Sequence, residues 1–182
     1  MIRVFIRQIQ RSEHVQEQGR VTLTEQRACA DALLRRVLRE YYGESAVGLA
    51  IARGENGKPY FPGAPEICYN ISHAGDYAVL AIGEEPVGVD IEKIRPIHPR
   101  VAERYLGNAH LTGREAILAW TKRESYGKFT GEGVFAKDYT LPHVFTELAA
   151  PEGYVICVCT ASGEVAAAES DFTELDKKNE GS

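Results

Sequence analysis

Apolar residues recur at two periods along this chain, and those periods predict its helices and strands. A stripe with helical spacing predicts a first helix from about Thr22 to Tyr42: Ala30, Leu33, Leu34, Val37, Leu38 and Tyr41. Thr22 and Glu25 have the spacing of a capping box. Gly43 is a plausible end of the helix, since glycine is common just past a helix C-terminus.

Apolar runs on either side of this helix predict β-strands. These runs lie near residues 1–7, 47–52, 67–71, 77–82 and 87–92. Asn56-Gly57 marks a turn between two of them. The connection Ser72–Asp76 separates another two, and we expect it to be a tight loop.

Two helices are predicted next, and strands follow them. Pro99 is a favourable first residue for a short helix that ends at Gly107. Thr112 and Glu115 form a second candidate capping box, which opens a long helix to about Lys128. Further strands are predicted near residues 139–148, 154–160 and 164–168, and the polar stretch from about Glu169 is expected to fray.

The order helix, strands, helix, strands predicts an α+β fold. We expect two pseudo-symmetric halves, residues 1–86 and 87–182, each a small antiparallel sheet packed against a long helix. In this arrangement the functional site lies at the interface between the halves. A repeat in the residues themselves is not visible.

Composition narrows the class of protein. The chain has 182 residues, of which 44% are hydrophobic and 26% charged, as in ordinary globular domains. No run of about 18 apolar residues is present, and the N-terminus alternates like a strand instead of resembling a signal peptide. We therefore expect a cytoplasmic protein. A net charge of −5 argues against nucleic-acid binding.

The four cysteines are expected to be small buried hydrophobic residues in a reducing compartment. They are Cys29, Cys68, Cys157 and Cys159, and no two of them form a C-x-x-C pair.

Two carboxylates stand two residues apart in the strand 87–92. Alternation along a strand puts Asp90 and Glu92 on one face, whereas Val87, Val89 and Ile91 share the other face and pack into a core. Neighbouring carboxylates repel each other and favour a shared cation. A polar strand face in water is the alternative.

The second long helix contributes a third carboxylate and a lysine. Trp120, Glu124 and Lys128 recur every four residues and therefore line one face of the helix. Trp120 is expected to pack inward, which leaves Glu124 and Lys128 at the edge of a cleft. Three hard oxygen ligands beside a cation suit a magnesium-dependent transfer of a phosphorylated group. The alternative is a surface salt bridge between Glu124 and Lys128.

Two shorter segments carry groups that can bind phosphate. Ser72 and His73 lie in the expected tight connection, where a hydroxyl and a ring are available to a ligand. Lys58 stands between Gly57 and Pro59, so its backbone is restricted. Each segment is also explained by a turn that binds nothing.

Taken in order, these blocks resemble the 4′-phosphopantetheinyl transferase family, specifically its surfactin-synthetase-activating (Sfp) type. The resemblance covers about Asn56 to Gly133. It lies in four segments: Gly57-Lys58-Pro59, residues 70–75, residues 87–92 and residues 120–128.

The resemblance implies an activity and a set of roles. The family moves the phosphopantetheine arm of coenzyme A to a serine of an acyl or peptidyl carrier protein and releases adenosine 3′,5′-bisphosphate. Asp90, Glu92 and Glu124 match its magnesium site, for which manganese is also suitable. Glu124 matches the leading candidate for taking the serine proton, and Lys128 the lysine at the diphosphate.

The remaining matches concern coenzyme A. Ser72 and His73 match a pair that contacts its phosphates, and Lys58 and Pro59 match the loop beside its adenine. Arg123 stands where the family usually has lysine and keeps the positive charge. Relatives often hold the 3′-phosphate with N-terminal basic residues, for which Arg20 and Arg27 are the candidates here.

Two other functions stay open at this point. A hydrolase that splits the coenzyme A diphosphate with water needs the same metal and lysine. The other alternative is a degenerate member that binds coenzyme A or a carrier protein without transfer. Arg123 and the short segment between Glu92 and Trp120 are the features that favour this alternative. Which carrier protein is used does not follow from the residues.

Overall fold

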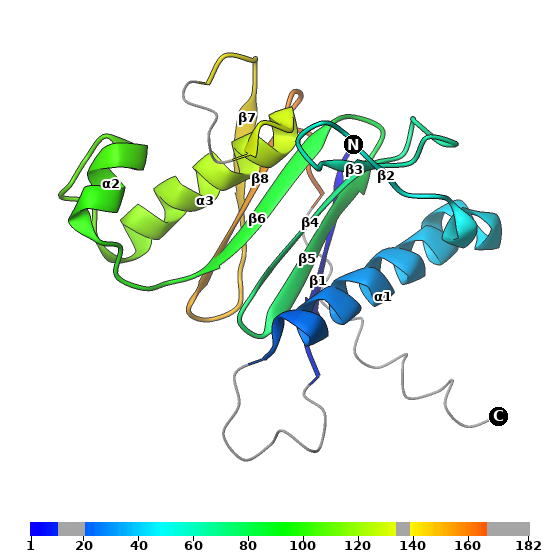
Figure 1. Cartoon of the computed structure of the whole chain (residues 1–182), viewed down its shortest axis with the longest axis horizontal. Coiled ribbons are helices and arrows are strands. Elements are labelled where there is room, and N and C mark those ends of the chain that lie inside the picture. The colour runs from blue at the N-terminus through cyan, green and yellow to red at the C-terminus, as the bar shows by residue number, and fades with distance from the viewer. Residues whose placement is uncertain (11–20, 134–138, 167–182) are drawn as a thin grey trace.

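The computed structural model describes residues 1–10, 21–133 and 139–166, and these residues form two three-stranded antiparallel sheets and a small two-stranded one, with helices on both sides (Figure 1). The first sheet has the order β1-β5-β4, with β1 at Arg3–Gln8, β4 at Cys68–Ala74 and β5 at Tyr77–Gly83. The second sheet has the order β6-β8-β7, with β6 at Val87–Lys93, β7 at Val144–Leu148 and β8 at Tyr154–Thr160. The α+β class is thus confirmed.

The helices and the small hairpin complete the described part of the chain. The helices are α1 at Leu23–Tyr42, the 3-10 helix η2 at Glu44–Gly48, α2 at Pro99–Leu106 and α3 at Gly113–Thr130. Strands β2 (Ala52–Arg53) and β3 (Pro59–Tyr60) pair through a turn at Gly57, whose φ is 83°. No helix of the described residues is long and apolar enough to cross a membrane.

Helix α1 packs on the first sheet as its sequence predicts. Both bonds of the capping box are formed: Glu25 N–H donates to Thr22 Oγ1 (3.2 Å), and Thr22 N–H donates to a Glu25 carboxylate oxygen (2.7 Å). Ala30, Leu33, Leu34, Val37 and Leu38 are buried against the sheet, whereas Tyr41 stays 38% exposed.

The two sheets share a second core. Val87, Val89 and Ile91 pack into it, as the alternation in β6 predicts. They meet apolar residues of β1, β5 and β8: Val4, Ile6, Val79, Ala81, Tyr154, Ile156 and Val158. Figure 1 shows α1 on one side of the paired sheets and α3 with α2 on the other. The opposite face of β6, which carries Asp90 and Glu92, is therefore turned toward α3.

Side chains join the edges of the two sheets where β4 runs beside β6. Val89 N–H donates to Asn70 Oδ1 (2.9 Å), and Ile91 N–H donates to Ser72 Oγ (3.4 Å). These bonds satisfy backbone donors on the open edge of β6, which are costly to bury without a partner. Strands β4 and β6 are thus joined edge to edge by these side chains.

Several predicted elements differ from the observed ones. The strand expected at residues 47–52 is not formed as such: residues 47–48 end η2, residues 49–51 belong to no helix or strand, and only Ala52 lies in a strand, the two-residue β2. The strand expected at 139–148 begins only at Val144, and in the described part of the strand expected at 164–168 Val165 makes an isolated bridge with Ile2. Thr112 makes no side-chain cap bond, so the second capping box is wrong.

Other predictions are confirmed or lie outside the described residues. None of the four cysteines forms a disulfide, and Cys157 and Cys159 are buried in β8 as predicted, whereas Cys29 and Cys68 are only partly buried. Helix α2 begins at Pro99 and is capped by Gly107. Arg20 and the stretch from Glu169 fall outside the described residues, and pseudo-symmetry between the halves stays a prediction.

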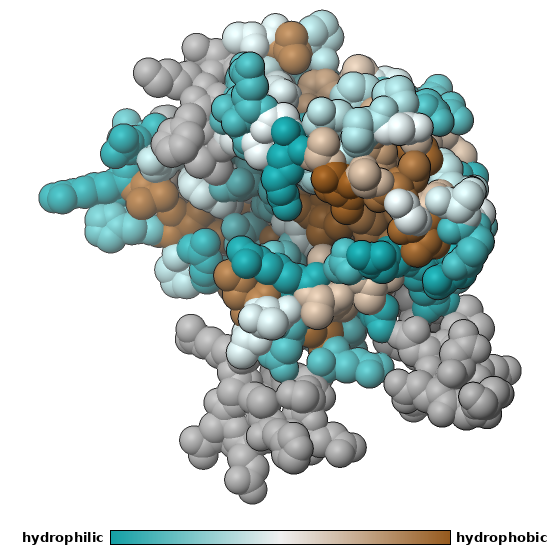
Figure 2. Space-filling model, turned by 45° about the vertical axis from the view of Figure 1, so that its right-hand side comes forward, coloured by the Kyte–Doolittle hydropathy of each residue, from teal (hydrophilic) through white to brown (hydrophobic). Residues whose placement is uncertain are grey.

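The face shown in Figure 2 is mostly hydrophilic, with an apolar area right of centre.

Candidate functional site

Asp90 is the centre of the candidate site. It lies on the face of β6 turned toward α3 and is only 4% exposed, so it is not part of a polar face in water. Its Oδ1 accepts hydrogen bonds from Ser72 Oγ and from Lys128 Nζ, both at 2.7 Å. Its Oδ2 is buried and has no hydrogen-bond partner among the described residues. A buried carboxylate oxygen without a partner destabilises the fold, and it is free to coordinate a bound cation.

Lys128 connects three elements at this point. Its ammonium donates to Asp90 Oδ1, to Ser72 Oγ (2.8 Å) and to the Val89 carbonyl oxygen (3.1 Å). The Ser72 hydroxyl in turn donates to Asp90. Helix α3 is thereby joined to β6 and β4. The alternative of a simple surface pair between Glu124 and Lys128 is not what the structure shows, because Lys128 pairs with Asp90.

Glu92 and Glu124 lie close enough to Asp90 to feel its charge. Burial, then repulsion by Asp90 and more weakly by Glu92, raises the pKa of Glu124 to about 7, against the opposing effect of Lys128. Burial and then Asp90 also raise the pKa of Glu92, against the effects of Arg95 and a hydrogen bond from Trp120. The three carboxylates therefore form one electrostatic group, whose mutual repulsion Lys128 and Arg95 offset only in part.

These residues fit a divalent cation, although they are not closed around one in the described part of the chain. No group of three or more His, Cys, Asp or Glu side chains there is gathered in a metal-holding arrangement. The bare Asp90 Oδ2 and the mutual repulsion of the carboxylates are nevertheless what a hard cation relieves. The magnesium site stays a prediction.

The row Trp120, Glu124 and Lys128 runs along the border of the buried face of α3, as its spacing predicts. All three residues are partly buried. The fully inward positions belong to other residues: Ala116, Ile117, Thr121, Ser125, Tyr126, Gly127 and Phe129. Trp120 is therefore not the main anchor of the helix. Its ring packs edge-on against Tyr105 of α2, with 5.7 Å between ring centres.

Ser72 and His73 lie in β4 and not in the loop expected at Ser72–Asp76, because the strand continues to Ala74 and turns only at Gly75. Burial lowers the pKa of His73, and the charges of Lys128 and Arg27 lower it further, against Asp90. His73, Lys128 and Arg27 are therefore neighbours. They form a basic flank beside the acidic group.

Lys58 is turned inward from the end of the β2–β3 hairpin. Its ammonium donates to the carbonyl oxygens of Phe129 (2.7 Å) and Val87 (3.2 Å), and burial lowers its pKa to about 8. An apolar cavity of about 290 Å³ lies beside its stem and Pro59. The cavity walls include Tyr60, Phe61, Pro65, Ile67, Tyr69 and Pro86.

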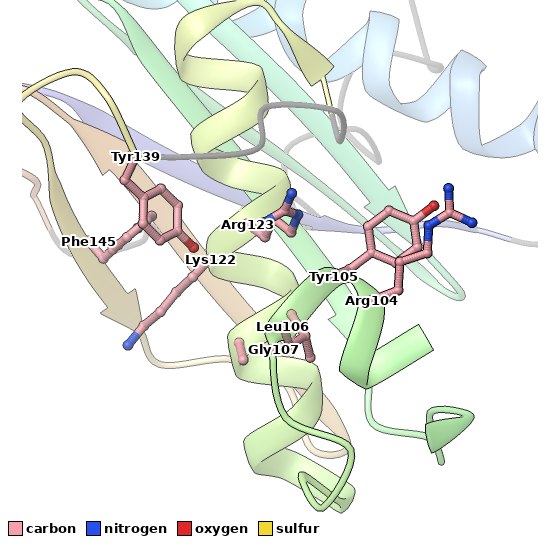
Figure 3. Close-up of a pocket in the computed structure, with 9 residues that line it drawn as sticks. Arg104, Tyr105, Leu106, Gly107, Lys122, Arg123, Tyr139 and Phe145 are labelled. Carbon is pink, nitrogen blue, oxygen red and sulfur yellow. The ribbon is translucent and has the colours of Figure 1, made fainter. Parts of the chain in front are cut away.

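A larger cavity of about 600 Å³ lies next to the site, between α2, α3 and β7 (Figure 3). Its walls combine basic and aromatic residues: Arg104, Tyr105, Lys122, Arg123, Tyr139 and Phe145. The Arg123 guanidinium lies 5.9 Å from the centre of the Tyr105 ring. The sequence analysis missed this cavity, since its walls come from distant segments. The aromatic residues near the long helix were the only available signal.

Comparison with known proteins connects this geometry to a family. Residues 2–85 match the family described as 4′-phosphopantetheinyl transferase, N-terminal. Over 114 residues the chain is 32% identical to a 4′-phosphopantetheinyl transferase of Bacillus subtilis, an overlap of 57% of this chain and 51% of that protein. Over these stretches the chain is similar to 4′-phosphopantetheinyl transferases.

Two further 4′-phosphopantetheinyl transferases show the same relation. The psf-1 protein of Bacillus pumilus is 32% identical over 114 residues, which cover 57% of this chain and 49% of that protein. AcpT of Salmonella typhi is 34% identical over 108 residues, which cover 49% of this chain and 55% of that protein. The chain spans about half the length of the curated relatives that it matches.

Proposed function

We propose that this chain transfers the 4′-phosphopantetheine arm of coenzyme A to a serine of an apo acyl or peptidyl carrier protein. The observation that carries the proposal is the joining of Asp90, Ser72 and Lys128 beside Glu92 and Glu124, with one Asp90 oxygen left without a partner. Homology to 4′-phosphopantetheinyl transferases supports it.

The reaction is a displacement at phosphorus. The serine oxygen bonds to the phosphorus that carries the pantetheine arm, and the bond from that phosphorus to the bridging oxygen of the diphosphate breaks. Adenosine 3′,5′-bisphosphate leaves with the bridging oxygen. The serine proton passes to a base, for which Glu124 is the candidate, directly or through water.

The acidic group would hold a divalent cation through Asp90, Glu92 and Glu124. Magnesium, or manganese in its place, neutralises charge on a diphosphate when it is bound. Lys128 adds a second positive charge for the leaving oxygen. Lys128 lies 2.7 Å from Asp90. A metal ion bound by Asp90 and the phosphate groups neutralised by Lys128 would therefore lie next to each other.

The basic flank would hold the rest of coenzyme A. Ser72, His73 and Arg27 are proposed for its phosphates from the side of residues 1–86, and Arg123 from α3. Pro59 and the stem of Lys58 lie beside an apolar cavity and are proposed as neighbours of the adenine. The active site would then lie between residues 1–86 and 87–182, in a cytoplasmic monomer.

Intact mass spectrometry of an apo carrier protein tests the proposal. The carrier is incubated with this protein, coenzyme A and magnesium, with and without a chelator. A mass gain equal to one phosphopantetheine arm, lost with the chelator, is expected. Splitting of coenzyme A without labelling would indicate a hydrolase. Intact coenzyme A with unlabelled acyl and peptidyl carriers would indicate a binding module.

A further inference from the structure

Lys58 is a partly buried cation whose ammonium donates hydrogen bonds to the protein's own backbone. It follows the β2–β3 turn, and its ammonium reaches the carbonyl oxygens of Val87 and Phe129 at 3.2 and 2.7 Å. Val87 belongs to β6, and Phe129, 42 positions later, belongs to α3. Lys58 therefore connects two elements that are distant in the sequence from each other and from the β2–β3 hairpin.

Both acceptors are groups that the secondary structure leaves open. Phe129 is in the last turn of α3, where carbonyl oxygens have no partner within the helix and the helix dipole is negative. Val87 begins β6 on the edge away from β8, where the strand has no ladder partner. A lysine ammonium has three donors and satisfies both carbonyls at once.

The two acceptors adjoin the centre of the candidate site. Phe129 directly follows Lys128, and Val87 precedes Asp90 by three residues. Between them, α3 and β6 touch closely at Gly88, where a Cβ atom would collide with the Ser125 carbonyl oxygen and the Phe129 amide nitrogen. Helix α3 and strand β6 are therefore in direct backbone contact at Gly88, and the two hydrogen bonds of Lys58 join them beside this contact.

We infer that Lys58 is a positioning residue that holds the end of α3 against the start of β6, so that Lys128 and Asp90 keep their 2.7 Å contact. This role rests on the proposed function for its effect on catalysis. It differs from contact with a coenzyme A phosphate, because the ammonium is already bound to two backbone carbonyls. Its loss changes the geometry of the reacting site and leaves the binding of coenzyme A nearly intact.

The kinetic test uses Lys58→Met, which keeps the stem and removes the ammonium, and Lys93→Met, which removes an exposed lysine from the far end of β6. Lys58→Met should lower kcat by about tenfold or more, since small displacements at a reacting site are costly. KM for coenzyme A should stay within about twofold. Lys93→Met should match wild type. A rise in KM with unchanged kcat would overturn the inference and make Lys58 a coenzyme A contact.

Amide hydrogen exchange tests the same inference without any activity. In Lys58→Met, amides of residues 125–131 and 87–91 should exchange faster than in wild type, whereas those of α1 should not change. Exchange equal to wild type in these segments would refute the positioning role. A wild-type protein that fails to label any carrier would instead refute the proposed function, and the exchange result would still decide the role of Lys58.

Discussion

The Lys128 ammonium and the Asp90 carboxylate form an ion pair at 2.7 Å that fixes helix α3 to strand β6. The Asp90 side chain is 6% exposed and that of Lys128 26% exposed. The net attraction of such a pair is small, because Asp90 has lost nearly all and Lys128 most of its contact with water. The same two groups face the place where a diphosphate and a cation are proposed to meet.

Lys128→Met should abolish most transfer activity and also destabilise the protein. The buried Asp90 loses its cation, so the free energy of unfolding should fall by about 2 kcal/mol, below the full cost of a wholly buried pair because Lys128 is partly exposed. Urea unfolding at pH 7 measures this change. The double variant Asp90→Asn with Lys128→Met should recover at least half of the loss. Equal stability of Lys128→Met and wild type would contradict the pairing.

Asp90→Asn should remove the response of the protein to magnesium. If the carboxylates hold the cation, magnesium at about 100 times its dissociation constant stabilises the wild-type protein by about 3 kcal/mol. Thermal unfolding with coenzyme A present, with and without magnesium, should show a rise in Tm for wild type and for the exposed control Glu115→Gln, and none for Asp90→Asn. The same rise in Asp90→Asn would exclude Asp90 as a ligand.

His73→Ala should act on coenzyme A binding. His73 lies in the basic flank with Lys128 and Arg27, so its loss should raise KM for coenzyme A by about tenfold, the usual effect of one hydrogen bond to a charged group. The value of kcat should change by less than about twofold, and the exposed control His110→Ala should behave as wild type. A pure loss of kcat would be incompatible with a binding role.

The stability of the protein should depend on Lys58 in alkaline solution. Its pKa is about 8 in the folded state against 10.5 ordinarily, so between these pH values the unfolded chain binds more protons than the folded one. The unfolding free energy of wild type should therefore rise, relative to Lys58→Met, as the pH increases from about 8 to 10.5, by at most about 3 kcal/mol. Paired urea titrations at several pH values measure the difference. A difference that is flat or falls over this range would contradict the burial of a lysine charge.

Local relationships could be predicted from the sequence because they depend only on spacing. Alternation in β6 put Asp90 and Glu92 on the face opposite Val89, and a four-residue repeat put Glu124 and Lys128 on one helix row. The capping box at Thr22 was predicted for the same reason. In each case the interacting residues are separated by fewer than five positions.

Contacts between distant segments could not be predicted in this way. Lys128 has Glu124 as its nearest acidic neighbour on the helix, yet it pairs with Asp90, because α3 packs directly on β6 at Gly88. Ser72 was expected in a loop, but β4 extends past it and presents its hydroxyl to Asp90. The inward turn of Lys58 depends on two backbone carbonyls from other elements, for which the sequence carries no signal.

The most direct test of the account compares wild type and Asp90→Ala in one experiment, by intact mass spectrometry of an apo carrier protein incubated with coenzyme A and magnesium. The account predicts that wild type adds one phosphopantetheine arm to the carrier and that Asp90→Ala, folded by circular dichroism, adds none. Labelling by both proteins at the same rate would contradict the assignment of the site to Asp90 and its neighbours. No labelling by wild type across acyl and peptidyl carriers would contradict the proposed transfer itself.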